Sequence, residues 1–295
     1  MRLYVIGGDG QVARSLREAA MLDKDIVFGY GARPGVDLLR PSSIGDAISD
    51  FRPDVVVNPA AYTAVDKAES EPDQAFALNR DGARFVAAAA AARGAPIIHL
   101  STDYVFDGKK QGAYTETDPT APQGVYGRSK LAGELTVADV NPKHIILRTS
   151  WVYAPFGSNF VRTMLRLATE RDRLRVVDDQ SGCPTYAPDI AKGIIAIAQT
   201  LVRSGWNPKF RGVTHLAGPD VRTWCEFARE ILRGAAERGR PSVPVDPIPT
   251  SEYPTPAARP ANSRLSAARL ESVFDLRLPA LEHSLANCLN RLLRH

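Results

Sequence analysis

A glycine-rich turn separates an apolar run from a helix-forming segment at the start of the chain. Residues 3–6 have the composition of a buried parallel strand, and the turn that follows reads Gly7-x-x-Gly10-x-x-Ala13. In this order Gly7 can make a tight turn, Gly10 lets the backbone approach a pyrophosphate, and Ala13 lets the helix pack closely on the strand. The N–H groups and dipole at the helix start attract phosphate. The segment therefore predicts a dinucleotide site, the alternative being a plain turn without a ligand.

Apolar strands continue to alternate with helices along the first half of the chain. A long helix is expected over 72–93, and strands are expected at 25–30, 54–58, 96–101 and 144–149. Such alternation predicts an α/β fold with a Rossmann-type doubly wound parallel sheet, whose strands end at a common edge. His99 lies inside the fourth strand, where a packed core histidine is the favoured interpretation.

The second half of the chain is less regular. Residues 178–185 are rich in turn formers, and the prolines crowded into 241–260 exclude a helix there and favour an extended loop. We therefore expect residues 1–150 to form an NAD(P)-binding domain, to which later segments such as 187–216 return. Residues 151–295 are expected to form mainly a smaller substrate-binding lobe.

Charge and cysteine usage narrow the classes of partner. The net charge of +4 is mild and the basic residues are scattered, so we expect neither nucleic acid nor a membrane as a partner. The longest run of small apolar residues, 87–92, is far too short to span a bilayer, and no charged leader precedes the first strand. The three cysteines lie far apart without a CxxC spacing, which favours a reducing compartment and hence the cytoplasm.

A tyrosine and a lysine, four residues apart, follow the fourth strand. On a helix Tyr126 and Lys130 share a face, so the phenol and the ammonium point into the same space. A nearby positive charge favours the phenolate, and a phenol tuned toward neutral pH can exchange a proton with a substrate oxygen. Such a pair also occurs by chance on surface helices. Thr102, at the end of the fourth strand, is expected to converge with the pair on the crevice beyond the sheet.

The end of the second strand bears on the choice of cofactor. Many NAD-binding folds hold the ribose hydroxyls there with an acidic residue, whereas residues 28–33 read FGYGAR without a carboxylate. Arg33 is available for a 2′-phosphate, which favours NADPH, and a solvated loop arginine is an equally good interpretation. Residues 59–63, after the third strand, can flank a cofactor. Trp151, after the fifth strand, is expected to form a wall of the substrate pocket.

Several longer stretches resemble known proteins. The glycine turn, the hydroxyl at a strand end and the Tyr-x-x-x-Lys pair together resemble the extended short-chain dehydrogenases/reductases. The stretches GGDGQVA, LSTDYVFDG, YGRSKLAGE, RTSWVY, DDQSGCPT and RPANSRL are similar to the dTDP-4-dehydrorhamnose reductase family, which completes dTDP-L-rhamnose synthesis. The similar stretches are spread from residue 1 to about 270, nearly the whole chain.

The resemblance implies a reaction and a set of roles. NADPH, or NADH, would deliver hydride to C4 of a 4-keto dTDP-sugar, and Tyr126 would protonate the oxygen. Lys130 would hold the nicotinamide ribose and lower the tyrosine pKa, while Thr102 would hydrogen-bond the keto group. The sugar nucleotide would contact Thr102, Asp103 and Trp151. The glycine turn, the loop after the second strand and the resemblance together assign these residues to the cofactor: Gly7, Gly10, Gln11, Val12, Arg33, Asp37, Leu38, Ala61, Tyr62, Thr63, Tyr126 and Lys130.

The chain also departs from some members of the family. Some relatives have an acidic residue where Tyr30 stands, so the resemblance favours NADPH over NADH. Others dimerise around magnesium held by glutamates, one of them early in the first helix, where Arg14 and Ser15 stand here. We therefore expect no metal, and either a monomer or a homodimer. Asn262 and Ser263 fall in a late family motif, for which a structural role is equally open.

Two other functions remain open within this fold. One is a non-catalytic, nucleotide-binding subunit that regulates methionine adenosyltransferase, and the presence of Thr102, Tyr126 and Lys130 argues against it. The other is a related nucleotide-sugar epimerase or dehydratase. Dehydratases of this kind need a glutamate directly after the aspartate, and Asp103 is followed here by Tyr104.

Overall fold

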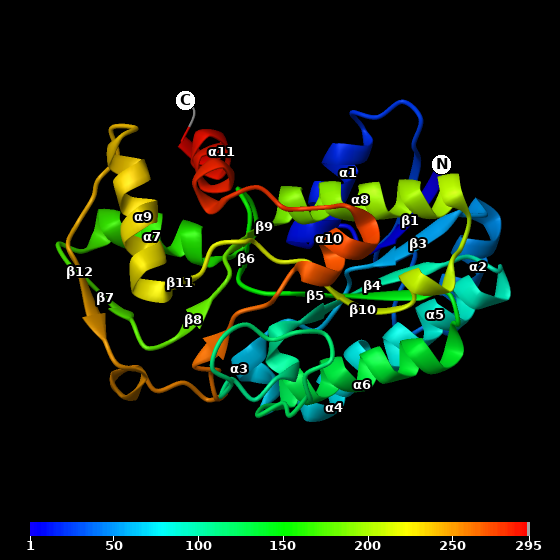
Figure 1. The fold of residues 1–295 in the computed structure, drawn as a ribbon, viewed down its shortest axis with the longest axis horizontal. Coiled ribbons are helices and arrows are strands. Elements are labelled where there is room, and N and C mark those ends of the chain that lie inside the picture. The colour runs from blue at the N-terminus through cyan, green and yellow to red at the C-terminus, as the bar shows by residue number, and fades with distance from the viewer. Residues whose placement is uncertain (294–295) are drawn as a thin grey trace.

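Six parallel strands form the centre of the protein, as seen in the computed structural model, which describes residues 1–293. Their order is β10-β5-β4-β3-β1-β2, so the chain starts at β1, adds β2 on one side of it and then adds β3, β4, β5 and β10 in turn on the other side (Figure 1). The doubly wound parallel sheet predicted from the sequence is confirmed. The strands are β1 (Arg2–Ile6), β2 (Val27–Gly31), β3 (Val55–Asn58), β4 (Ile97–Thr102), β5 (His144–Thr149) and β10 (Gly212–His215).

Helices cover both faces of this sheet (Figure 1). On one face α1 (Gln11–Ala20) and α8 (Ala187–Ser204) pack on the strands through a core rich in Ile, Leu and Val. On the other face lie α2 (Pro41–Phe51), α5 (Ala83–Ala92) and α6 (Val125–Val140). Because both faces are buried, the strands read as continuous apolar runs rather than as alternating ones. His99 is one of these interior residues, and its Nδ1 lies 3.2 Å from the Asn58 amide nitrogen.

The long helix expected over 72–93 is interrupted by one wider turn. It consists of α4 (Pro72–Phe76), a π-helical turn η1 (Ala77–Gly82) and α5. Asn79 lies on the wider turn, where its amide bonds the backbone of Tyr62 and the hydroxyl of Ser129. A π turn inside a helix is often found at a functional site, and here it turns an amide toward the loop after β3.

A second apolar core lies beyond the carboxyl ends of the strands. It is built by α7 (Phe160–Glu170), α9 (Trp224–Ala236), α11 (Leu281–Leu293) and the strand pair β7 (Leu174–Val177) and β12 (Val245–Ile248). The proline-rich segment, expected to be an extended loop, supplies β12, and Pro247 is accommodated because β12 is an edge strand. The shorter elements are α3 (Val65–Ala68), η2 (Asp103–Val105), β6 (Val152–Tyr153), β8 (Ser181–Gly182), β9 (Thr185–Tyr186), η3 (Pro208–Phe210), β11 (Arg222–Thr223), η4 (Thr250–Glu252), β13 (Asn262–Ser263) and α10 (Ala268–Phe274).

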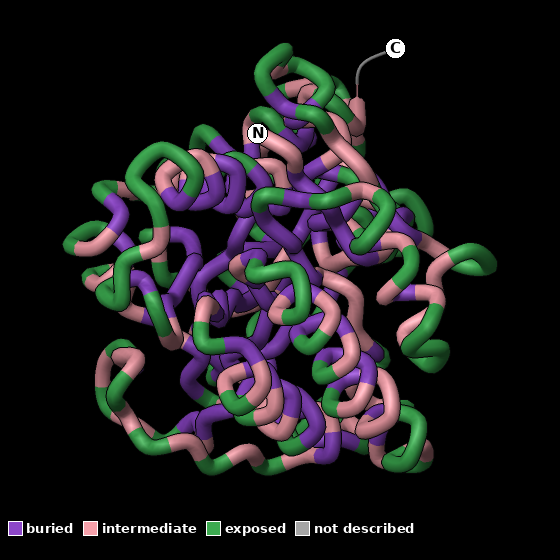
Figure 2. Tube along the Cα trace, turned by 90° about the vertical axis from the view of Figure 1, so that its right-hand side faces the viewer, coloured by how far each residue is buried: buried purple, intermediate pink, exposed green. Residues whose placement is uncertain are grey.

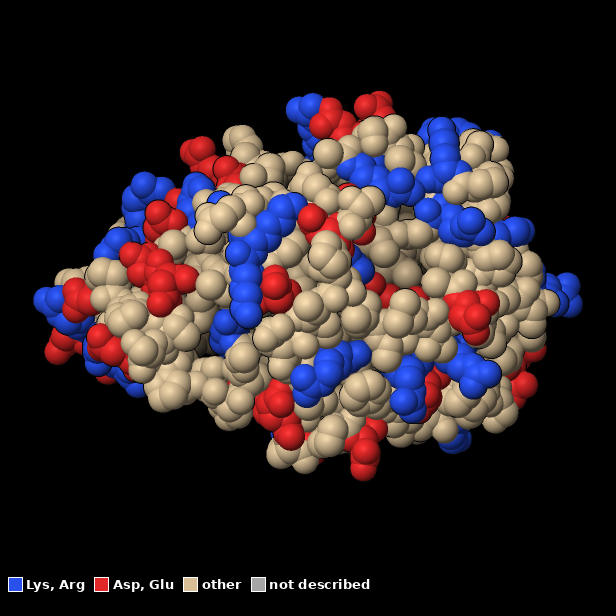
Figure 3. Space-filling model, turned by 60° about the horizontal axis from the view of Figure 1, so that its bottom comes forward, with Lys and Arg blue, Asp and Glu red and all other residues tan. Residues whose placement is uncertain are grey.

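The surface is ordinary in its distribution of charge and exposure. Figure 2 shows buried segments gathered in the interior and exposed segments on the outer turns. On the face drawn in Figure 3, acidic and basic side chains are interspersed. Within residues 1–293, none of the helices combines the length and apolar character needed to cross a bilayer.

A buried ion pair joins α6 to the middle of the sheet. The Arg148 guanidinium on β5 donates to both carboxylate oxygens of Glu134 on α6, at 2.9 and 2.6 Å, and both side chains are only 4% exposed. Ser101 on β4 donates to the same carboxylate at 2.5 Å. The Arg148 guanidinium also lies 5.0 Å from the centre of the Phe106 ring. One helix and two strands are thus held by a single charged cluster.

Removing the carboxylate should destabilise the protein strongly. In Glu134→Ala the Arg148 guanidinium stays buried without its partner, so we expect the free energy of unfolding to fall by about 3–5 kcal/mol. Glu170→Ala is the matched control, because it breaks the exposed Arg166–Glu170 pair, which should cost under about 1 kcal/mol. Denaturant titration of both variants measures the difference. Equal losses in the two variants would contradict the structural importance of the pair.

Candidate active site

A cavity of about 570 Å³ lies at the carboxyl ends of β1, β3, β4 and β5. This is the place where open α/β sheets bind their ligands. The cavity brings together ten of the site residues expected from the sequence, namely Gly10, Gln11, Val12, Ala61, Thr63, Thr102, Asp103, Tyr126, Lys130 and Trp151.

The glycine turn has the shape needed for close approach of a ligand. Gly7 has a φ of +104°, which an L side chain rarely adopts, and its N–H donates to Gly31 O at 2.6 Å. A Cβ on Gly10 would meet nothing within 4 Å, so the backbone at the start of α1 faces open space. The Gln11 side chain accepts from the Asn159 amide at 3.0 Å, which ties α1 to the start of α7. The exposed helix N-terminus thus offers donors for phosphate.

Lys130 is buried on α6 with its ammonium inside the cavity wall. Its Nζ donates to the Leu100 carbonyl at 2.6 Å, which anchors it beside the end of β4. Burial lowers the pKa of Lys130 to about 8, although the Glu134 charge raises it. The side chain is therefore a cation at neutral pH, close to the point where it would lose its proton.

Tyr126 lies one turn before Lys130 and is partly buried. Burial raises the pKa of its phenol above the ordinary value, the Thr102 hydroxyl lowers it by hydrogen bonding, and the charges of Asp103 and Tyr104 raise it further. The lowering expected from Lys130 stays a prediction, and in the protein alone the pKa of the phenol is raised overall. The physical reason is that desolvation of the phenolate outweighs the stabilising contacts.

Two glycines let α6 approach its neighbours closely. A Cβ at Gly127 would lie 2.2 Å from the Tyr104 carbonyl oxygen, and one at Gly133 would lie 2.1 Å from the Asn79 carbonyl oxygen. The start of the helix is held by Glu69, whose carboxylate accepts from Val125 N at 2.7 Å. These contacts determine how deep Tyr126 and Lys130 reach into the cavity.

Thr102 and Asp103 form a small hydrogen-bonded group at the end of β4. Thr102 Oγ1 lies 3.0 Å from Asp103 Oδ1 and accepts from Tyr104 N at 3.2 Å. Burial raises the pKa of Asp103 to about 6, opposed by hydrogen bonds from Ser263, Thr102 and nearby backbone. The sheet register places Thr149 of β5 beside Thr102, so two hydroxyls line this part of the edge.

Trp151 is held in an unusual backbone conformation at the far wall of the cavity. Its φ is +48°, and its ring stacks on Trp224 with centroids 3.4 Å apart and planes 7° from parallel. A Cβ on Gly182 would lie 2.3 Å from the indole, so glycine is required there. A non-glycine residue at positive φ persists only where packing enforces it, and such strain is often found at functional sites.

The remaining predicted residues do not line the cavity. Gly7 shapes the turn behind it, and Arg33 is exposed on a loop. The Tyr62 hydroxyl donates to Glu71 at 2.9 Å. The Asp37 carboxylate accepts from Leu39 N, and Leu38 packs on Gly82.

Late in the chain, two residues of one motif have different neighbours. The Asn262 amide donates to the carbonyls of Lys110 and Gly112, which is a structural role. Ser263 lies near Asp103 instead, where hydrogen bonding by its side chain lowers the pKa of that carboxyl.

Sequence reasoning missed several residues that line the cavity. The feature of the sequence that could have identified them is their position, because they follow strands or turns that end at the same edge of the sheet. They include Asp9, Val65, Thr149, Ser150, Gly157 and Ser158. Across residues 1–293, we find no group of three or more His, Cys, Asp or Glu side chains arranged to hold a metal ion.

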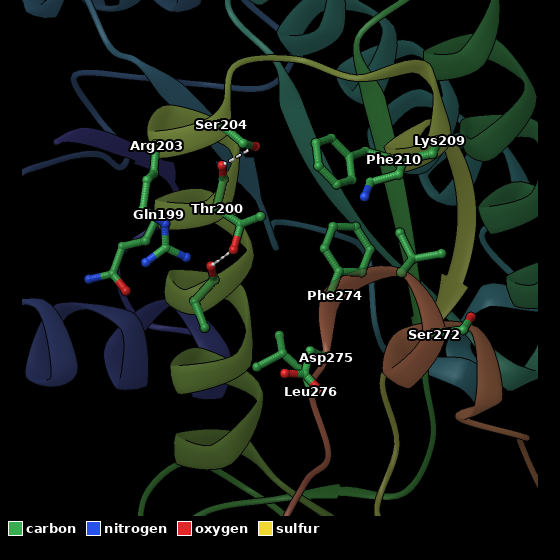
Figure 4. Close-up of a pocket in the computed structure, with 12 residues that line it drawn as sticks. Gln199, Thr200, Arg203, Ser204, Lys209, Phe210, Ser272, Phe274, Asp275 and Leu276 are labelled. Carbon is green, nitrogen blue, oxygen red and sulfur yellow. Dashed lines mark hydrogen bonds between the residues drawn. The ribbon is translucent and has the colours of Figure 1, made fainter.

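A second cavity of about 460 Å³ lies elsewhere, between the end of α8, η3 and α10 (Figure 4). Arg203 and Gln199 come from α8, and the stacked rings of Phe210 and Phe274 lie across from them. None of the site residues expected from the sequence lines this cavity. The expected site residues that line a cavity therefore lie in the crevice at the strand ends.

Comparison with known proteins agrees with this geometry. A sequence profile for the RmlD substrate binding domain matches residues 1–294. A dTDP-4-dehydrorhamnose reductase from Sinorhizobium fredii is 51% identical over 96% of this chain and 95% of its own length. The one from Salmonella typhimurium is 42% identical over 96% and 95% of the two chains. A Bacillus anthracis dTDP-4-dehydrorhamnose reductase, crystallised with NADP, has a TM-score of 0.89 and 35% identity, with 98% of each chain covered. The chain therefore belongs to the dTDP-4-dehydrorhamnose reductase family.

Proposed function

We propose that this protein reduces the 4-keto group of dTDP-4-dehydro-L-rhamnose with NADPH and releases dTDP-L-rhamnose. One observation carries the proposal: Thr102, Tyr126 and Lys130 line a single cavity that also contains the glycine turn of a dinucleotide site. Family membership supports the same substrate class, and the complex of the Bacillus anthracis relative with NADP supports the cofactor. NADH remains a possible substitute, since no residue here excludes it.

The residues around the cavity suit NADPH. The open space over Gly10 and the free N-terminus of α1 fit a pyrophosphate. The Lys130 ammonium fits the ribose hydroxyls, and Ala61 and Thr63 line the same cavity. Arg33 is proposed to meet the 2′-phosphate from its exposed loop. When bound, NADPH supplies the hydride that adds to the carbonyl carbon.

The protein contributes the proton and the orientation of the substrate. Tyr126 gives its phenolic proton to the sugar oxygen as negative charge develops there, and Thr102 hydrogen-bonds the same oxygen. The Lys130 charge stabilises the phenolate that is left behind. The Lys130 charge thereby offsets the burial that raises the pKa of Tyr126, because the phenol must ionise only during the reaction.

The two cores suggest a division of labour. We propose that residues 1–150, with α8 and β10, bind the cofactor, and that the rest of 151–295 forms mainly the substrate lobe. Support comes from α8 packing on α1 and from β10 pairing with β5. Trp151, stacked on Trp224 of the second core, would contact the sugar nucleotide. A cytoplasmic location is proposed from the three free, buried cysteines. The proposed assembly is a monomer or a homodimer.

Loss of the phenol should abolish most turnover without loss of cofactor binding. Tyr126→Phe removes the general acid, so we expect kcat for dTDP-4-dehydro-L-rhamnose to fall by about 10²–10⁴-fold. NADPH oxidation followed by absorbance measures the rate, and fluorescence titration measures NADPH binding. Tyr253→Phe, on an exposed tyrosine, is the matched control and should match the wild type. A Tyr126→Phe enzyme with full activity would refute the assigned role.

Lys130 should make NADPH binding depend on pH. Its pKa of about 8 means that the ammonium is present below this value and is lost above it. We expect the Kd for NADPH to rise in the wild type as pH increases through about 8. In Lys130→Ala the Kd should be higher at neutral pH and lack this dependence, whereas Lys24→Ala, on the exposed surface, should behave as the wild type. An unchanged Kd in Lys130→Ala would count against contact with the ribose.

A further inference from the structure

The Thr102 hydroxyl has several neighbouring hydrogen-bonding groups but only one proton to donate. Its oxygen lies 3.0 Å from Asp103 Oδ1 and 3.2 Å from Tyr104 N, and hydrogen bonding by Thr102 also lowers the pKa of the nearby Tyr126 phenol. A threonine hydroxyl has one proton to donate and two lone pairs that accept. The Tyr104 N–H always occupies one lone pair, because a backbone amide can only donate.

The charge of Asp103 therefore decides which way the remaining hydrogen bonds run. If Asp103 is ionised, the Thr102 hydroxyl donates its hydrogen bond to the carboxylate and can only accept a hydrogen bond from Tyr126. The phenolic proton then points at Thr102 and away from the substrate. If Asp103 is neutral, it donates to Thr102, and the Thr102 proton is free to point toward Tyr126 or the substrate oxygen.

The surroundings of Asp103 favour the neutral form. The residue is 3% exposed, and its Oδ2 is buried without a hydrogen-bond partner among the described residues. An ionised carboxylate oxygen left in that state is costly. Burial accordingly raises the pKa of Asp103 to about 6, despite the hydrogen bonds of Ser263 and Thr102.

Groups from several elements face Asp103 or its immediate neighbours. Three titratable side chains have their pKa raised by the Asp103 charge, namely Tyr104 of η2, Tyr126 of α6 and Cys183 between β8 and β9. Two arginines lower the pKa of these neighbours: Arg259 lowers that of Tyr104, and Arg264 lowers that of Cys183. Lys130 lines the same cavity.

We propose that Asp103 works as a neutral carboxylic acid, a positioning residue that donates to Thr102 and so directs the protons of Thr102 and Tyr126 toward the substrate keto oxygen. The inference rests on the proposed function. In the reaction, the O–H bond of Tyr126 breaks, and its proton joins the oxygen of the carbonyl that has accepted hydride. Thr102 then donates a hydrogen bond to the new phenolate. Asp103 keeps its own proton throughout, and solvent restores the proton of Tyr126 after product release.

The pH dependence of kcat/KM tests this role. The neutral form of Asp103 is the active one, so kcat/KM of the wild type should fall with rising pH, by about tenfold per pH unit above the Asp103 pKa. In Asp103→Asn the amide donates to Thr102 at every pH. We expect kcat/KM of this variant to stay within about twofold between about pH 6 and 8. If Asp103 had a purely structural role, the fall of kcat/KM with rising pH would persist in Asp103→Asn.

Controls separate this inference from the proposed function. Asp139→Asn, on an exposed face of α6, should keep the wild-type profile. NADPH binding by Asp103→Asn shows that the variant is folded. If Asp103→Asn does not fold, the pH profile of the wild type and the Thr102→Val variant still test the role of Asp103. Loss of the Thr102 hydroxyl must lower kcat and remove the fall of kcat/KM with rising pH.

Three results would overturn the role of Asp103. The first is a wild-type kcat/KM that rises as pH increases through 6, because an ionised Asp103 would then be the active form and would accept a hydrogen bond from a sugar hydroxyl. The second is a wild-type kcat/KM that does not change with pH. The third is a fall of kcat/KM with rising pH that persists in Asp103→Asn. Failure of the proposed function looks different, because the wild type would then not oxidise NADPH with dTDP-4-dehydro-L-rhamnose at any pH.

Discussion

The buried pair between Glu134 and Arg148 is the interaction on which the site depends. It fixes α6 against β5, and Ser101 adds β4 to the same cluster. Backbone contacts at Gly127 and Gly133 then set the depth of the helix. An ion pair this deeply buried contributes little net stability compared with apolar packing, but it tolerates no loss of one partner. Its value here lies in geometry, because it holds the helix that carries the phenol and the ammonium beside the strand that ends in a hydroxyl.

Burial determines the protonation of the groups in the cavity. It raises the pKa of Asp103 to about 6 and that of Tyr126 above its ordinary value, and it lowers the pKa of Lys130 to about 8. All three shifts favour the neutral form, since a low-dielectric wall disfavours any isolated charge. The cavity therefore disfavours charge on the phenol of Tyr126 until substrate and cofactor complete the site, while Lys130, with a pKa of about 8, still carries its charge at neutral pH.

Much of the architecture could be predicted from local pattern. Alternating apolar strands and helices predicted the parallel sheet, and the glycine turn and Tyr-x-x-x-Lys pair pointed to residues that the fold gathers at one edge. Less was predictable where distant segments meet. The π turn at Asn79, the stack of Trp151 on Trp224 and the contact of Ser263 with Asp103 each join residues far apart in the chain. No local period encodes such contacts, nor the hydrogen bond from the Tyr62 hydroxyl to Glu71.

The sequence by itself determined the class of fold and the chemical groups available, because strand and helix periods and residue types are local properties. The tertiary structure alone decided how those groups are charged and which way their hydrogen bonds run. Thr102 and Asp103 are neighbours in any conformation of the chain. Only the folded protein buries the carboxylate, leaves its Oδ2 without a partner among the described residues and brings Tyr126 into the same cavity as the hydroxyl. Desolvation depends on everything packed around a group, and no stretch of sequence contains that information.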